Sequence, residues 1–221
     1  MTLYIAQDVA DVRALLAEAR NHAPDAPIAT QLAARATCIL DAHRVRDSRI
    51  AMIVKSWWPP ALGQSMDDIL ASDFAEDDAR LAIAREHGFP DWASVAALGD
   101  ARLDPAFEAA VDVLMAGDAL GLGNALEEKP TLISATSAYG HQATLLHYIA
   151  ANGVESHRQV TPLNAATLAQ MLIDAGADRS AHANMYGGGQ TPLALAATSA
   201  HPAEAGVADA LCQVLRPDAA A

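Results

Sequence analysis

The chain has 221 residues, of which 52% are hydrophobic and 5% are aromatic, and its 27 acidic and 14 basic residues give a net charge of −13. This composition is typical of a folded, alanine-rich helical protein and excludes the disordered class. The acidic balance argues against nucleic-acid binding, which needs a basic face, and the apolar runs are too short to predict a membrane span.

The cysteines and the N-terminus predict a simple cellular setting. Cys38 and Cys212 are far apart and have no metal-ligand spacing, so we expect buried thiols in a reducing compartment. The N-terminus lacks a basic region followed by a long apolar run, which is what a targeting segment would show. We therefore expect a cytoplasmic protein with no metal and no cofactor.

The first hundred residues predict a series of short helices. Apolar residues recur there at helical spacing, and aspartate or serine stands where a helix would begin. The apolar run at 50–54 suits either a strand or a buried helix, and we favour the helix. The expected helices cover 8–20, 28–43, 50–54, a short stretch opened by Ser65, a stretch from Asp73 to Gly88, and 91–98.

The segment "SWWPPALGQ" interrupts this series and predicts a loop, because two consecutive prolines remove hydrogen-bond donors. Trp57 and Trp58 stand beside these rigid prolines. Large aromatic side chains in such a place either fill a core or anchor a binding partner. We favour the core for this pair and keep both alternatives.

After residue 100 the pattern changes to pairs of helices. Asp104 precedes Pro105 as a helix cap, Gly117 closes that helix, and Asp118 begins another that ends before Pro130. Further along the chain, three threonines are expected to cap helices: Thr144, Thr161 and Thr191. Because every strong periodic signal has helical spacing and helix caps, we predict an all-α protein.

The motifs of this second part resemble the ankyrin repeat. Thr144 is followed by His147 and Gly153, the expected helix in "ATLAQMLIDAGAD" closes on Gly176-Ala177-Asp178, and Thr191-Pro192-Leu193 precedes a pair of alanines. The spacing from Thr144 to Thr191 exceeds the ankyrin period of about 33 residues, because "GVESHRQVTPLN" is inserted between two helices. More loosely, the chain resembles a bacterial group in which an N-terminal helical region precedes divergent ankyrin units. The segments that carry this resemblance are "DDARLAIAREHGFPDWASV", "LLHYIAANGVE" and "MYGGGQT".

This resemblance implies a domain organisation. Residues 101–221 would form about three ankyrin-like helical hairpins, and residues 1–100 a helical capping region packed on them. Such a cap is expected because the first hairpin of a stack otherwise exposes apolar surface.

The resemblance also implies where a binding site would lie. Ankyrin units present their loops and inner helices on one concave face, and inserts in repeat units usually lie on the binding side. We expect a partner- or ligand-binding surface with Tyr186 projecting from its glycine run. The candidate residues are Trp57, Trp58, His147, Tyr148, Asn152, Arg158, Tyr186, Gly187, Gly188 and His201.

Two functions fit this surface. The favoured one is a non-catalytic interaction module whose concave face binds another protein. The alternative is a small-molecule-binding protein or enzyme, in which the inserts close a histidine-containing pocket and His147 or His201 acts as acid or base. A structural or regulatory role as a homodimer stays open. An open groove would favour the first function, and a closed cavity the second.

Overall fold

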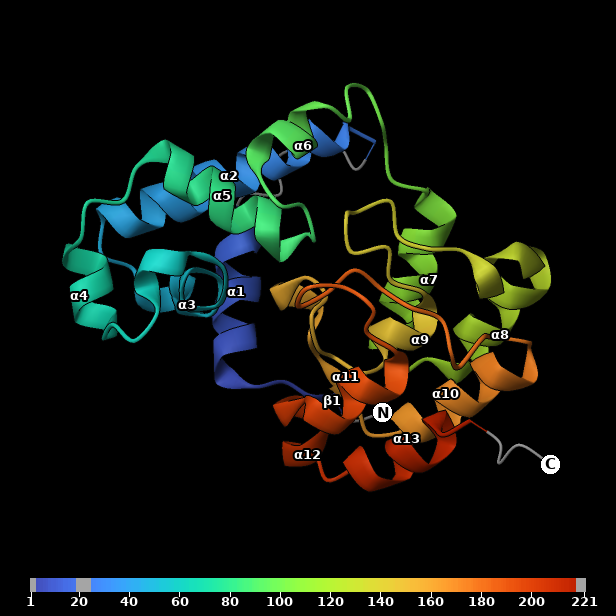
Figure 1. Ribbon diagram of the computed structural model, residues 1–221. Helices are drawn as coiled ribbons and strands as arrows, with labels where there is room; N and C mark the ends of the chain where they lie inside the picture. Colours follow the sequence, from blue (N-terminus) through green and yellow to red (C-terminus); the bar gives the residue numbers. More distant parts are fainter. Residues whose placement is uncertain (1–2, 19–24, 218–221) are drawn as a thin grey trace. The chain divides into compact units, whose positions relative to one another are not determined.

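A computed structural model describes residues 3–18 and 25–217 (Figure 1). The chain divides into two compact units, and both are discontinuous in sequence. The N-terminal unit comprises Gln7–Leu103 together with Glu155–His157. The C-terminal unit comprises Met1–Ala6, Asp104–Val154 and Arg158–Ala221. Each unit therefore contains a short segment from a distant part of the chain.

The N-terminal unit is helical, and its core lies where α5 packs against α2 and α3. Ile39, Ile53 and Ile83 are fully buried in it. The end of the first expected helix, residues 19–20, lies outside the described residues. The elements of this unit are α1 (Gln7–Glu18), α2 (Ile28–Arg44), η1 (Ser48–Ile50), α3 (Ala51–Trp57), η2 (Pro59–Ala61), α4 (Met66–Ala71), α5 (Glu76–Glu86), α6 (Trp92–Ala96) and the start of η4 (Ser156–Arg158).

Two of the expected helix starts in this unit are capped as predicted, whereas α1 begins at Gln7, one residue before the expected cap Asp8. The Ser65 hydroxyl accepts the backbone N–H of Asp68, and the Asp91 carboxylate accepts that of Ser94. Asp73, by contrast, was wrongly expected to open α5. The helix begins at Glu76 instead, and the Asp78 carboxylate accepts the backbone N–H of Ala75 at 2.9 Å.

The segment "SWWPPALGQ" is only partly the loop that was expected. Trp57 ends α3, and Pro59–Ala61 form the 3₁₀ turn η2. Proline is tolerated in the first turn of a helix because its missing N–H has no helical partner there. The two prolines thus begin a new turn as well as ending the preceding helix.

The C-terminal unit consists of packed helices and one pair of very short strands (Figure 1). Helix α7 packs against α8 and α9, and α13 packs against α10 and α11. Its helical elements are α7 (Pro105–Met115), α8 (Ala119–Glu128), η3 (Pro130–Ser134), α9 (Leu145–Tyr148), α10 (Ala165–Asp174), α11 (Pro192–Thr198), α12 (Ala200–Glu204) and α13 (Ala208–Leu215).

The strands modify the all-α expectation. The protein is mostly helical, but β1 (Leu3–Tyr4) and β2 (Thr161–Pro162) pair antiparallel, with Leu3 opposite Pro162. Thr161 was expected to cap a helix, and this expectation is wrong. It is fully buried within β2, and Asn164 precedes the first residue of α10.

Three of the other expected caps of this unit follow the sequence pattern. The carboxylates of Asp104 and Asp118 accept backbone N–H groups in the first turns of α7 and α8. The Thr191 hydroxyl accepts the backbone N–H of Ala194 at 3.2 Å. Gly117 follows α7 with a φ of 74°, a conformation that glycine adopts without a steric penalty. Within the described residues, no helix is long and apolar enough to cross a membrane.

Candidate functional site

Two loops of the C-terminal unit lie side by side, and the second of them carries the candidate residues Tyr186, Gly187 and Gly188. One loop precedes α9, and the other, at 183–190, precedes α11. The backbone N–H of Asn184 donates to the carbonyl of His141 at 2.8 Å, and the Asn184 side chain donates to the carbonyl of Gly140 at 3.2 Å. Ala183 and Gln190 close the second loop through an isolated β-bridge.

His147 lies beneath these loops and is fully buried. Its Nδ1 accepts the backbone N–H of Thr144 at 3.1 Å, so Nε2 carries the proton and donates to the carbonyl of Gln190 at 3.1 Å. Burial lowers the pKa of His147 to about 4, although the carbonyl of Gln190 opposes this shift. The imidazole is therefore neutral at pH 7, and both nitrogens are engaged in the protein.

Tyr186 is the most prominent aromatic side chain on the second loop. Its side chain is 57% exposed, and its backbone has a φ of 50°, which is uncommon for a non-glycine residue. The hydroxyl donates to Oδ1 of Asn152 at 2.7 Å, and desolvation near this end of the ring raises the pKa of the phenol. Gly187, Gly188 and Gly189 follow with positive φ angles, so the ring stands beside a stretch without side chains.

Asn152 holds this ring from the loop that follows α9. Its Nδ2 donates to the carbonyl of Leu195 at 3.1 Å and lies 3.2 Å from the hydroxyl of Thr198, both in α11. Gly153 lies under the ring, because a Cβ added there would stand 3.1 Å from Cε2 of Tyr186. We call the group formed by Asn152, Gly153, Tyr186, Gly187, Gly188 and Thr198 the Tyr186 surface.

His201 follows Thr198, a member of this surface, by three positions in the sequence and lies in the first turn of α12. The preceding Ser199 donates its hydroxyl proton to the carbonyl of Ala151, next to Asn152. Nδ1 of His201 is buried and has no hydrogen-bond partner within residues 3–18 and 25–217. No hydrogen bond joins His201 to Tyr186 in this part of the chain.

Tyr148 and Arg158 lie away from the solvent-exposed part of the site. Tyr148 is fully buried, and the Arg158 guanidinium lies 5.9 Å from the centre of its ring. Arg158 also pairs with Glu108 at 2.5 Å and with Asp112 at 3.0 Å, both on α7. These contacts fix the inserted segment to α7 and leave only 12% of the Arg158 side chain exposed.

The two tryptophans belong to the N-terminal unit and differ from each other. Trp58 is buried, its Nε1 donates to Asp78 at 2.9 Å, and its ring meets Phe74 edge-on. Trp57 is partly exposed at the end of α3. Trp58 therefore fills the core, as was expected for the pair, whereas Trp57 keeps part of its surface accessible to solvent.

The N-terminal unit also contains a buried polar cluster around Glu86 that no sequence motif predicts. Glu86 is almost fully buried, and its Oε1 accepts the backbone N–H of Ser156 at 3.0 Å. Desolvation raises the pKa of Glu86, although this hydrogen bond and the charge of Arg35 oppose the shift. Glu155, whose charge also raises this pKa, is itself fully buried.

His87 connects the same cluster to α2. An Arg35 nitrogen lies 2.5 Å from Nε2 of His87, and because arginine only donates, Nε2 must accept. Nδ1 of His87 therefore carries the proton and donates to the carbonyl of Ile83 at 2.7 Å. A glutamate at the C-terminal end of a helix, next to a histidine, is the one signal in the sequence that pointed to this cluster.

The structure thus brings Asn152, Tyr186, Gly187 and Gly188 together on one surface and places His147 beneath it. Within the described ranges, no group of three histidine, cysteine or acidic side chains could hold a metal ion. Comparisons with protein-family models, with curated proteins and with solved structures find no match to this chain.

Proposed function

We propose that the chain is an ankyrin-type interaction module that binds a protein partner through the Tyr186 surface. The observation that carries the proposal is the state of Tyr186, a large aromatic side chain that is 57% exposed and yet held in place by Asn152. Tyrosine is enriched among the residues that dominate binding energy at protein interfaces. Holding the ring in place before binding reduces the entropy lost when a partner docks.

The ankyrin type of repeat is supported by the local geometry of its motif residues. Thr144 and Thr191 each precede a helix, and His147 hydrogen-bonds from one loop region to the next through Gln190. Helices α7 and α8 pack as a hairpin, and α13 packs against both α10 and α11. These features agree with stacked helical hairpins whose loops lie along one edge.

The structure favours binding over catalysis at this surface. An acid or base needs a nitrogen or oxygen free to exchange a proton with a substrate. Both nitrogens of His147 are engaged by backbone groups, and the side chain is fully buried. We therefore propose that His147 has no catalytic role and that the surface acts by binding.

A site-specific crosslinking experiment tests this function. The full chain is prepared with a photo-crosslinking phenylalanine analogue in place of Tyr186, and a control carries the analogue in place of Leu120, which is 76% exposed on α8. Irradiation in extracts of the source cells should give a discrete crosslinked protein from position 186 and not from position 120. The crosslinked protein is then identified and purified for affinity measurements.

Binding of that protein is compared between the wild type and three variants. Tyr186→Ala should weaken binding by about 2 kcal/mol or more, roughly thirtyfold, as expected for an interface anchor. Tyr186→Phe keeps the ring and should weaken binding less, and Leu120→Ala should leave it unchanged. Equal affinity of Tyr186→Ala and wild type would refute the proposal, provided that their melting curves agree.

A further inference from the structure

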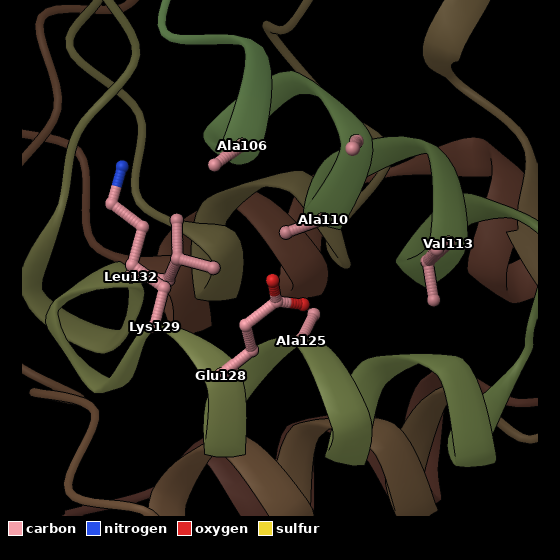
Figure 2. A pocket seen from close by; sticks show the side chains of 8 residues that line it. Ala106, Ala110, Val113, Ala125, Glu128, Lys129 and Leu132 are labelled. Carbon is pink, nitrogen blue, oxygen red and sulfur yellow. The ribbon is translucent and has the colours of Figure 1, made fainter.

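The hairpin of α7 and α8 contains a hollow that has no part in the Tyr186 surface (Figure 2). Its volume is about 350 Å³, at the lower end of the range of about 300–1,000 Å³ that is usual for ligand pockets. Most of its walls are short apolar side chains, so the space between the helices is left unfilled. The lining residues are Ala106, Ala109, Ala110, Val113, Ala125, Glu128, Lys129 and Leu132.

One carboxylate, that of the solvent-exposed Glu128, borders this apolar hollow. Figure 2 shows the Glu128 side chain rising from α8 between Ala110 and Ala125. Within residues 3–18 and 25–217, its carboxylate has no hydrogen bond and no ion pair. The adjacent Lys129 does not neutralise it, because its Nζ is paired with Asp104 at 2.7 Å. Within the described residues, no side chain therefore neutralises the charge of the Glu128 carboxylate.

The position of Glu128 in its helix strengthens this negative potential. Helix α8 ends at Glu128, its last turn also contains Glu127, and no basic residue lies in that turn. The C-terminal end of a helix carries a partial negative charge, which normally favours lysine or arginine there. The net charge of −13 adds to the attraction for cations.

We propose that this hollow binds an alkylammonium group. The ammonium nitrogen would donate to the Glu128 carboxylate, and the alkyl chain would lie among the alanines and against Leu132. An alkylammonium fits because its N–H groups need acceptors while its methylene chain gains from leaving water. A small free amine and a lysine side chain of a partner both have this chemistry. The proposal does not depend on the function of the Tyr186 surface, since the two share no residue.

Alanine-methyl NMR on the full chain tests the proposal directly, because four alanines line the hollow. Titration with n-butylammonium at low salt should shift the methyl signals of Ala106, Ala109, Ala110 and Ala125. The neutral analogue n-butanol should bind at least about tenfold more weakly, because it lacks the charge-assisted hydrogen bond. Added salt should weaken the binding of n-butylammonium and leave that of n-butanol nearly unchanged.

Two variants and one matched control test the contributions of the carboxylate and of the hollow separately. Glu128→Gln keeps the shape of the side chain and should weaken n-butylammonium binding by at least about tenfold. Glu127→Gln is the matched control, since it removes the same charge from a residue that does not line the hollow. Ala109→Leu should abolish binding with Glu128 intact, because the larger side chain fills the space. Ala109 is exposed in a helix, so this change is compatible with the fold.

A second titration distinguishes the two sources of the amine. A tripeptide with an acetylated N-terminus and an unmodified lysine side chain is titrated next. If it binds as tightly as n-butylammonium and shifts the same methyl signals, the source of the amine is a partner lysine. Binding of n-butylammonium alone would identify a small free amine. The proposal is overturned if n-butylammonium shifts none of these methyl signals at millimolar concentration. It is also overturned if Glu127→Gln and Glu128→Gln weaken binding equally.

Discussion

The carboxylate of Glu86 accepts the backbone N–H of Ser156 at 3.0 Å, although the two residues are 70 positions apart. Both residues are almost fully buried. The contact places the start of η4 against the end of α5 within the N-terminal unit. Its strength depends on the protonation state of a carboxyl group that has lost most of its contact with water.

Glu86→Gln should stabilise the protein at neutral pH. Desolvation raises the pKa of Glu86 above its ordinary value of 4.5, so the folded state holds a proton that the unfolded state releases. The contribution of Glu86 to the free energy of unfolding is therefore fully present below pH 4.5, and it is lost as the pH rises through the pKa of Glu86 in the folded state. Glutamine stays neutral, so urea midpoints of the variant and the wild type should diverge as pH rises from 4.5 to 8. A wild type that is more stable than the variant throughout this range would contradict the prediction.

His147 predicts the opposite dependence on pH. Burial lowers its pKa from 6.5 to about 4, so the unfolded state binds more protons between these values. The contribution of His147 to the free energy of unfolding is therefore fully present above pH 6.5. It falls by up to about 3 kcal/mol as the pH decreases to 4. His147→Gln should show a flatter pH profile of unfolding free energy than the wild type, and equal slopes of the two profiles between pH 4 and 6.5 would contradict the prediction.

Gly153→Ala should displace Tyr186 and destabilise the fold. The φ of Gly153 is 74°, and an added Cβ would stand 2.7 Å from Sδ of Met185 and 3.1 Å from the Tyr186 ring. The strained backbone alone costs about 1–3 kcal/mol. Gly187→Ala is a matched control, since its φ is 98° but an added Cβ meets nothing within 4 Å. Denaturant unfolding should therefore show a larger loss for Gly153→Ala than for Gly187→Ala.

The two adjacent tryptophans should respond differently to truncation. Trp58→Ala removes a buried ring, its contact with Phe74 and its hydrogen bond to Asp78, and should cost about 3–5 kcal/mol. Trp57→Ala should cost less, because this side chain keeps part of its surface in water. Thermal unfolding of the two variants gives the comparison, and equal losses would show that Trp57 is also part of the core.

Helix boundaries were predictable where a local signal determines them. Asp104, Asp118 and Thr191 cap the helices that follow them, because each cap needs only a side-chain oxygen near the next turn. Thr161 carries the same signal but pairs with Tyr4 in a strand. That outcome depends on a residue far away in sequence, so no local pattern could reveal it.

The candidate site was predictable to a similar degree. The glycine run beside Tyr186 indicated an exposed ring, and the structure places the ring partly in solvent. The hydrogen bond from Tyr186 to Asn152 and the close approach of Gly153 depend on how two loops meet. The cluster around Glu86 also depends on a distant segment, since its partner Ser156 comes from the insert.

The assignment of Glu155–His157 to the N-terminal unit has a consequence for the order in which the protein can fold on the ribosome. During synthesis, residues 7–103 emerge long before the segment that completes their unit. Until that segment arrives, the Glu86 carboxylate lacks the N–H of Ser156 and must stay hydrated or take up a proton. The N-terminal unit is therefore finished only after about half of the C-terminal unit has been made.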